Sequence, residues 1–321
     1  TTAESLLSRT NPVAFAAIPC SLGEIQYGMP GILSNYKALQ IKVDKRFSNG
    51  FQFGAAYALS TYRTWSGRVI DNRDYHKSIG TSTGNPKHRF TASAIWEVPK
   101  LKGGQAWMRA ILNDYQLSSI VQIASAAPTS VNISGGNASF GGIGFGGFDL
   151  EGDGTFTFRL PGSTIGSFGH EIDADGIRQL VALYNAQYAA PKDVPLSQIP
   201  KGPLRDIIGT AFPYIVLPDK FAFGDGFMTH DLRLTRVIRI RENMRLSIIG
   251  EGFNIFNIAN LTGFSGTLDQ WIRPTLPTAA NPLGTPGRNP DFNFGQPTGR
   301  VNAIFGSGGP RAFQVAARLS F

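Results

Sequence analysis

Residues 34–62 read SNYKALQIKVDKRFSNGFQFGAAYALSTY, and this stretch decides the fold. Apolar and polar residues alternate in it with a period of two, which is typical of a strand with two different faces. Leu39, Ile41 and Val43 share one of these faces. Ser48-Asn49-Gly50 predicts a tight turn, because Asn and Gly accept a positive φ. We therefore expect a hairpin with strands over 34–47 and 51–62.

The same alternation returns in five further segments. The strands that it predicts cover 87–98, 112–125, 229–241, 244–257 and 311–321. Short turns at 48–50, 99–104 and 242–244 contrast with long connections at 63–86, 126–228 and 258–310, which are rich in Gly, Pro, Asn and Ser. Short turns at one end and long loops at the other are typical of an outer-membrane β-barrel.

The strand number bears on domain organisation. About seven strands are an odd number, and bacterial barrels close with an even number. We therefore expect residues 1–33 to be an outer-loop segment and residues 34–321 to be the C-terminal strands of a larger barrel. The expected fold class is all-β: an antiparallel transmembrane β-barrel fragment with long outer loops.

Composition excludes several other classes. Charged residues make up 16% of the 321 residues, hydrophobic residues make up 42%, and there is one Cys, which argues against a disordered or disulfide-stapled chain. The formal net charge is +8, but Lys and Arg are scattered singly, so we expect no nucleic-acid partner. A transmembrane helix is excluded, because no run approaches about 18 apolar residues.

The polar faces of the strands are expected to line the lumen of the barrel, where their side chains bond to one another and to a plug. These residues are Gln40, Lys42, Asp44, Arg46, Arg89, Glu97, Arg233, Arg239, Glu251 and Arg318. Arg236 breaks the pattern, since it falls on the apolar face between Leu234 and Ile238. It either extends towards the headgroups or marks a β-bulge.

The loops carry few motifs with a chemical meaning. Gly142-x-Gly144-x-x-Gly147 lacks the strand and helix that a dinucleotide site needs, so we expect no cofactor. The spacing of apolar residues over 177–189 predicts one short amphipathic helix. Two clusters of loop carboxylates resemble the opening of a Ca²⁺-binding loop, but we interpret them as solvated turns, with Ca²⁺ binding as the less favoured alternative. They are Asp149, Glu151, Asp153, Asp173 and Asp175. The four His form no metalloprotease spacing, and we expect no catalysis.

Several segments together resemble one family. They are Ser34–Gln40, Lys45–Gly50, Lys87–Phe90, Asp231–Thr235 and Glu251–Asn257. These segments look like the C-terminal barrel of TonB-dependent outer-membrane receptors, in particular the Oar-like branch with a carboxypeptidase-regulatory-like N-terminal domain. The resemblance implies a parent barrel of about 22 strands around a plug.

The resemblance also implies a function and partners. The chain would be the barrel portion of an energised transporter that takes up a bound nutrient ligand, and it would be inactive as a fragment. Its partners would be outer-membrane lipid, the barrel assembly machinery, the missing strands and plug of the parent, and TonB through the parent. In this family the last strand ends in an aromatic residue that the assembly machinery reads, and the chain offers Phe321, with Phe313 on the same strand.

Two other interpretations stay open at the level of sequence. A secreted or periplasmic β-sandwich that binds glycans would bury the apolar faces of its strands against each other. A porin or adhesin barrel would expose the same faces to lipid but would lack energy coupling.

Overall fold

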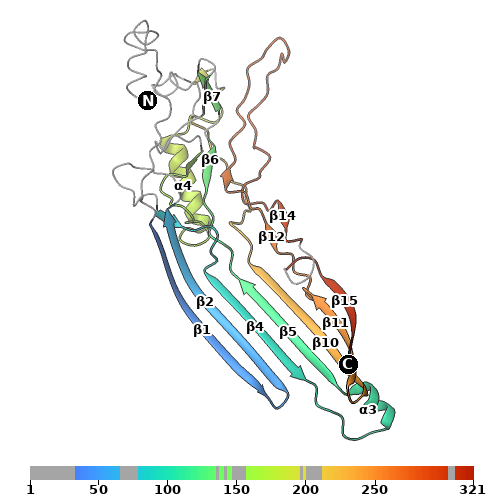
Figure 1. Cartoon of the computed structure of the whole chain (residues 1–321). Coiled ribbons are helices and arrows are strands. Elements are labelled where there is room, and N and C mark those ends of the chain that lie inside the picture. The colour runs from blue at the N-terminus through green and yellow to red at the C-terminus, as the bar shows by residue number, and fades with distance from the viewer. Residues whose placement is uncertain are drawn as a thin grey trace.

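A long antiparallel sheet dominates the structure (Figure 1), a computed structural model that describes residues 33–65, 79–134, 137–140, 143–146, 157–195, 198–199, 212–302 and 308–321. Its strands follow one another in the order β1-β2-β4-β5-β10-β11-β15, and β3 (Ile79–Thr81) pairs with β2. The bounds are β1 Ser34–Ser48, β2 Phe51–Trp65, β4 His88–Glu97, β5 Tyr115–Ala124, β10 Phe227–Arg241, β11 Met244–Phe253 and β15 Ala312–Ser320.

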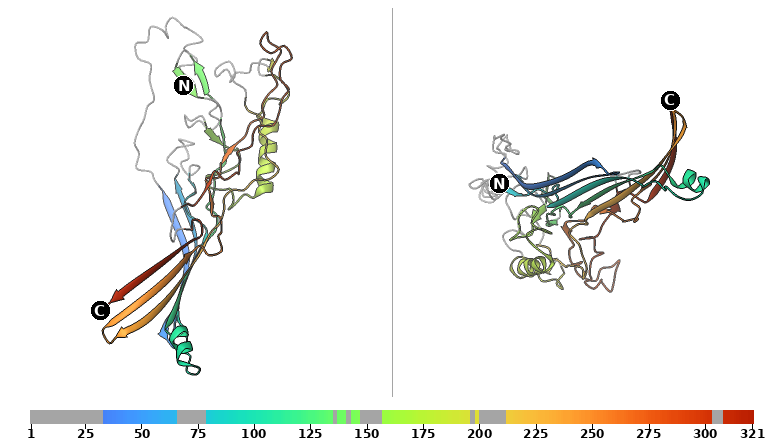
Figure 2. Two further views of the ribbon diagram at one scale, coloured as in Figure 1. Left: turned by 90° about the vertical axis from the view of Figure 1, so that its right-hand side faces the viewer. Right: turned by 90° about the horizontal axis from the view of Figure 1, so that it is seen from below.

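The sheet is open within the described part of the chain. There, β1 pairs only with β2, and β15 pairs only with β11, so that each presents one free edge. Seen end-on, the strands form a curved arc (Figure 2). The antiparallel, mostly β architecture that the alternation predicted is therefore confirmed, and the seven long strands lie where the sequence placed strands.

The register separates the two faces of the sheet. One row across five strands is entirely apolar: Ile41, Tyr57, Phe90, Ile123 and Met228. The neighbouring row, shifted by one residue, is mostly polar: Lys42, Ala56, Thr91, Gln122 and Thr229. Because paired residues of an antiparallel sheet point to the same side, the alternation in each strand becomes one apolar face and one polar face.

The apolar face is exposed. Leu39 keeps 57% of its surface, Val43 52% and Val315 83%. A soluble β-sandwich would bury these side chains in a core, so the structure contradicts the sandwich interpretation.

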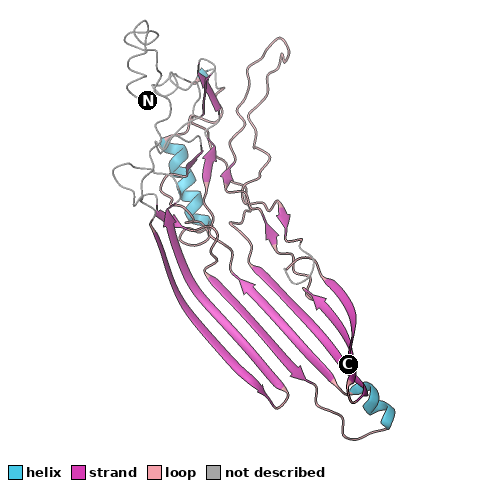
Figure 3. Cartoon of the chain, in the orientation of Figure 1, coloured by secondary structure: helices cyan, strands magenta, loops and turns pink. Residues whose placement is uncertain are grey.

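The ends of the sheet differ as the loop lengths predicted, with one exception. The turn between β4 and β5 was expected to be short, at 99–104, with a strand from 112. Instead it contains a helix, α3 (Ala106–Leu112), and β5 begins at Tyr115 (Figure 3). The prediction failed because Gly103-Gly104 reads as a hairpin turn, whereas Ala106–Leu112 consists mainly of good helix formers.

The long connections fold into a structure of their own, which we call the outer domain: the described residues of 126–226 and 258–302. It contains a small sheet of β6 (Asn132–Ser134), β9 (Thr157–Arg159) and β13 (Thr267–Leu268), and the helix α4 (Ala174–Gln187). Two short hairpins accompany them: β7 (Asn137–Phe140) with β8 (Ile143–Gly146), and β12 (Leu261–Thr262) with β14 (Gly299–Arg300).

The buried hydrophobic cluster lies in this outer domain and not against the long sheet. Its members are Val131, Ile133, Phe158, Leu160, Phe168, Ile177, Val181, Tyr184, Ile215, Leu268 and Phe294. They come from both long connections, so the two connections are held together by one core. Among the described residues, no helix has the length and apolarity needed to cross a membrane.

Candidate functional site

The polar face of the sheet carries a hydrogen-bonded group centred on Glu251. The carboxylate of Glu251 is 9% exposed, forms an ion pair with the guanidinium of Arg233 and accepts a hydrogen bond of 2.7 Å from Gln314 Nε2. The three residues lie side by side on β10, β11 and β15. Two of the predicted lumen residues are therefore partners of each other.

A second group on this face lies at β1. Lys42 Nζ and Asp44 Oδ2 are 2.9 Å apart, and Asp44 stands opposite Gly54 of β2. A Cβ at Gly54 would lie 2.8 Å from Asp44 Oδ1, so the glycine leaves room for the carboxylate. Gln40, Arg89 and Glu97 follow the same parity, whereas Arg46 lies in the register shift between Lys45 and Ser48, where parity does not fix its direction.

The short-turn end of the polar face is basic. Arg239 stands directly opposite Arg245, and Arg318 stands opposite Ser247 on the neighbouring strand. Within the described part of the chain, none of these three arginines has a carboxylate partner. Like charges that face each other across a strand pair repel, so this end of the face attracts anionic groups.

Two asparagines fasten the strand ends to the outer loops. Asn254 is 2% exposed and has a φ of 46°. Its side-chain Nδ2 donates to the carbonyls of Ile258 (2.9 Å) and Gly309 (2.6 Å), and its Oδ1 accepts from the backbone amide of Ile258 (3.0 Å). Asn260, 3% exposed, donates to the carbonyls of Met228 (3.0 Å) and Gly308 (2.6 Å). Asp231 Oδ1 accepts a hydrogen bond of 2.8 Å from the backbone amide of Asn254. Asn254 and Asn260 therefore form a structural junction, because a side-chain amide both donates to and accepts from backbone groups.

The helix α4 lines two depressions on the described part of the outer domain. It begins after Asp173, whose carboxylate accepts a hydrogen bond of 2.8 Å from the Gly176 amide, and it buries Ile177, Val181 and Tyr184. The helix predicted over 177–189 is confirmed, and it starts three residues earlier, at Ala174, because Asp173 caps it.

The carboxylates considered for Ca²⁺ are placed only in part. Asp173 is the helix cap, and Asp175 pairs with Arg178 Nη1 at 3.1 Å. Asp149, Glu151 and Asp153 lie outside the described residues. In the part of the chain that the structure describes, no three His, Cys, Asp or Glu side chains gather into a possible metal site.

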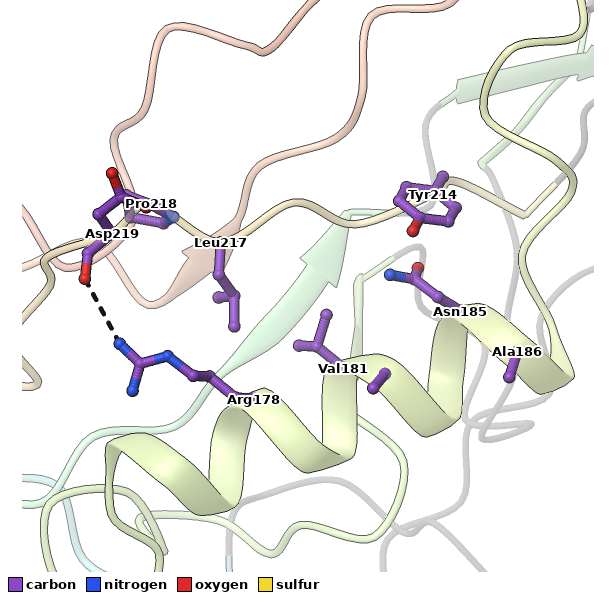
Figure 4. A pocket seen from close by; sticks show the side chains of 9 residues that line it. Arg178, Val181, Asn185, Ala186, Tyr214, Leu217, Pro218 and Asp219 are labelled. Carbon is purple, nitrogen blue, oxygen red and sulfur yellow. Dashed lines mark hydrogen bonds between the residues drawn. The ribbon is translucent and has the colours of Figure 1, made fainter.

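A groove of about 560 Å³ runs between α4 and the segment 214–219 (Figure 4). Asn185 holds the two sides together, since its Nδ2 donates to the Ile215 carbonyl (2.8 Å) and its Oδ1 accepts the Ile215 amide (2.9 Å). Val181, Leu217 and Tyr214 give the groove apolar and aromatic walls. At one end Arg178 Nη2 donates to the Asp219 carbonyl at 3.4 Å, with its guanidinium carbon 5.2 Å from the centre of the Phe221 ring.

A second hollow of about 580 Å³ lies at the start of α4. Its lining includes His170, Glu171 and the rings of Phe221 and Phe223. Phe221 lines this hollow, and its ring also contacts the guanidinium of Arg178, which lines the groove. The two depressions are open and neighbour each other, with apolar walls and a few charged groups.

The family follows from comparison with known proteins. The family model described as an outer membrane beta barrel domain matches residues 2–314. This chain belongs to that outer membrane β-barrel family. Its protein is accordingly located in the outer membrane of the cell, and the exposed apolar face is the face towards lipid. No curated protein and no solved structure shows significant similarity to the chain.

The C-terminus of this outer membrane β-barrel chain has the pattern of a lipid-facing strand. Phe313 is 73% exposed in β15, and Phe321, which follows the strand, is 94% exposed. The terminal residue lies at the same end of the sheet as the short turns (Figure 1). This is the place that an assembly signal requires, and the signal itself stays a prediction.

Burial alters two ionisable groups of the outer domain. Desolvation raises the pKa of the Tyr184 phenol, whose hydroxyl has no hydrogen-bond partner among the described residues. Desolvation also lowers the pKa of Arg273, which donates to the carbonyls of Ala190 (2.8 Å), Pro191 and Val194 (3.2 Å). Arg273 thus ties the segment after α4 to the other long connection.

Sequence reasoning missed the residues that build the groove. Asn185 and Tyr214 belong to segments far apart in sequence, and the hydrogen bond of Asn185 to the Ile215 carbonyl spans 30 residues. The only local signal was the apolar spacing of α4, which indicates a buried face but not what packs on it.

Proposed function

We propose that this chain is the C-terminal barrel portion of a TonB-dependent outer-membrane receptor of the Oar-like branch, which takes up a nutrient ligand. The proposal rests on the resemblance in the five segments named above and is consistent with the family assignment. The observation that carries it is the combination of an open barrel sheet with a folded outer domain. An open sheet needs further strands to satisfy its two edges, and they would be supplied by the rest of a larger barrel.

The outer domain is the proposed ligand-capturing part. Loops on the outer side reach solvent first, and a core of their own gives them a fixed shape. The groove beside α4 combines the Tyr214 ring, apolar walls and the Arg178 guanidinium, which suits an amphipathic nutrient. We propose no catalytic role, and the expected partners are the lipid bilayer, the barrel assembly machinery, a plug and TonB.

The polar face fits a lumen that holds a plug. Its central part is neutralised by the Arg233–Glu251 pair, whereas Arg239, Arg245 and Arg318 are left without carboxylates in the described part of the chain. A plug with acidic groups at this level would satisfy them. A water-filled porin lumen would instead leave three cations facing the channel and would favour anion flow.

Two measurements on the complete gene product test the proposal. A plugged, TonB-coupled receptor is expected to bind the purified C-terminal domain of TonB and to show no steady conductance in a planar bilayer until urea releases the plug. An open, steady channel without TonB binding would establish the porin interpretation. A folded barrel with neither conductance nor TonB binding, before or after urea, would favour an adhesin.

A further inference from the structure

The helix α3 (Ala106–Leu112) contributes no side chain to the buried core. None of its residues is buried, and Trp107, Ile111 and Leu112 are 61%, 50% and 52% exposed. A helix of this length is unstable by itself in water, where isolated helices below about 12–15 residues are marginal. The three large apolar side chains that this short helix exposes therefore need a surface to cover them.

Polar contacts fix the connection that contains α3, residues 100–113, which we call the α3 turn. Lys100 Nζ and Asp114 Oδ1 are 2.7 Å apart, and the Leu101 amide donates to Asn113 Oδ1 at 2.7 Å. The Asn113 amide in turn donates to the Arg109 carbonyl at 3.2 Å and ends the helix. These bonds present the helix in a defined place at the end of β4 and β5.

Arg236 connects α3 to the lipid-facing side of the sheet. Its Nη2 donates to the Ala110 carbonyl, and its guanidinium carbon lies 5.5 Å from the centre of the Tyr115 ring. The register runs through Arg236 without interruption, opposite Tyr115 and Ile248, and the bulge of β10 lies further on, between Arg239 and Arg241. The apolar-face arginine is thus explained by an extended side chain that reaches α3.

Lys45 lies on β1 near the same, short-turn end of the sheet. It stands opposite Phe53 on the apolar face, and its Nζ reaches the carbonyls of Ser48 (3.1 Å) and Phe51 (2.9 Å). Phe47 and Trp96, 48% and 43% exposed, lie near this end as well. Extended cations and aromatic rings near the same end of the strands are typical of a membrane–water interface.

The charge of the α3 turn fits an anionic surface. Residues 99–113 contain Lys100, Lys102 and Arg109; in the described part of the chain Lys100 is paired with Asp114, whereas Lys102 and Arg109 have no carboxylate partner. Basic residues together with Trp, Ile and Leu on a short helix are the pattern of a helix that lies in the membrane interface. The turn lies at the end of the sheet with the short turns (Figures 1 and 2), which faces the periplasm in this family.

We propose that the α3 turn (residues 100–113) embeds in the periplasmic leaflet of the outer membrane. Trp107, Ile111 and Leu112 enter the acyl region, while Lys102 and Arg109 contact the phosphate groups of anionic phospholipid. The turn continues the lipid-facing surface of the strands and keeps Arg236 at headgroup depth. This role does not depend on whether the barrel is a TonB-coupled transporter, a porin or an adhesin.

The test uses the complete gene product folded into vesicles of phosphatidylethanolamine and phosphatidylglycerol. In a cysteine-free background that includes Cys20→Ser, a nitroxide is attached at Trp107→Cys, Ile111→Cys or, as the matched control, Glu242→Cys in the turn between β10 and β11. The labels at 107 and 111 are expected to favour collisions with oxygen over a water-soluble nickel complex by several-fold, relative to the label at 242. Equal nickel accessibility at all three sites would overturn the proposal, as would shielding of 107 and 111 from both reagents, which indicates a protein partner.

A charge test addresses the lipid headgroup. Lys102→Glu combined with Arg109→Glu, or vesicles of phosphatidylcholine alone, should each lower the oxygen preference of the label at 111. An unchanged preference in both cases would contradict the role of anionic phospholipid. If Trp107→Cys fails to fold, brominated lipids should quench the tryptophan fluorescence of the unaltered chain more than that of Trp107→Phe, and equal quenching would overturn the insertion of Trp107.

Discussion

The lipid-facing sheet and the outer domain place the same residue types in opposite positions. In the sheet, Leu39 and Val315 are 57% and 83% exposed, whereas Phe158 and Leu160 of the outer domain are 1% and 0% exposed. The sheet turns its apolar side chains outward because lipid surrounds it, and the outer domain turns them inward because water surrounds it. One chain is therefore folded for two solvents, and the predictions below test that division.

Deleting Phe321 is expected to have the largest effect. The terminal aromatic lies beyond β15 at the short-turn end, and the resemblance implies that the assembly machinery reads it. Most of the protein should fail to reach the outer membrane, while deleting Asp149–Gly154 of the outer loop should leave the level nearly unchanged. The measurement is the amount of heat-modifiable barrel in outer-membrane fractions, and equal levels of both deletions would contradict the role of Phe321.

Phe158→Ala should separate the two regions. Removing a fully buried ring costs about 3–5 kcal/mol, and Phe158 packs against Tyr184 and Phe212. Limited proteolysis is expected to cut the outer domain while the barrel keeps its heat-modifiable band. Phe313→Ala, which removes a ring 73% exposed, is the matched control and should leave the outer domain protected. Loss of the barrel band in Phe158→Ala would show that the regions fold as one unit.

Leu234→Arg should destabilise the sheet through its contact with lipid. Leu234 lies in the middle of β10 on the apolar face and is 46% exposed. An arginine facing lipid costs about 0–1 kcal/mol near the interface and about 2–4 kcal/mol at the midplane, and Leu234 lies two residues further from the short turns than Arg236. Thr235→Arg, on the opposite face of the same strand, should cost far less, because that face is polar. Equal urea midpoints for the two variants in vesicles would contradict the assignment of the faces.

Tyr184→Phe should change the pH dependence of the outer domain. Burial raises the pKa of this phenol, so the folded form keeps its proton where the unfolded form loses it. The protonated Tyr184 therefore does not lower the stability of the outer domain below the unfolded pKa of about 10. Above that pH the free energy of unfolding falls by up to about 1.4 kcal/mol per pH unit. Thermal unfolding followed by tryptophan fluorescence should show a shallower alkaline decline in the variant. Identical alkaline profiles would mean that Tyr184 ionises freely in the folded protein.

Asp173→Ala removes the N-terminal cap of α4 and also tests whether this carboxylate binds Ca²⁺. Loss of the helix cap should lower the stability of the outer domain by about 1 kcal/mol. Asp175→Ala removes only the exposed pair with Arg178 and should cost at most about 0.5 kcal/mol. Thermal melts of the outer domain provide the measurement. A stabilisation by Ca²⁺ that disappears in Asp173→Ala would show that this carboxylate binds a metal.

The sequence by itself determined the strands of the sheet and the division of its faces. A period of two is a local property, so Leu39, Ile41 and Val43 could be assigned to one side from their spacing alone. The tight turn at Asn49-Gly50 was equally local, and both residues have the positive φ values of 53° and 76° that the turn requires. The helix α4 followed from its apolar spacing, and its cap at Asp173 fixed a boundary that periodicity left open.

The tertiary structure alone decided where the long loops go and what they build. The core joins residues as distant as Val131 and Phe294, and the groove depends on the bonds of Asn185 to Ile215. The position of Arg236 was also decided there, since its partner Ala110 belongs to a helix 126 residues earlier in the chain. The physical reason is that periodicity records which side of an element meets an apolar environment. Only packing decides whether that environment is lipid or another part of the same chain.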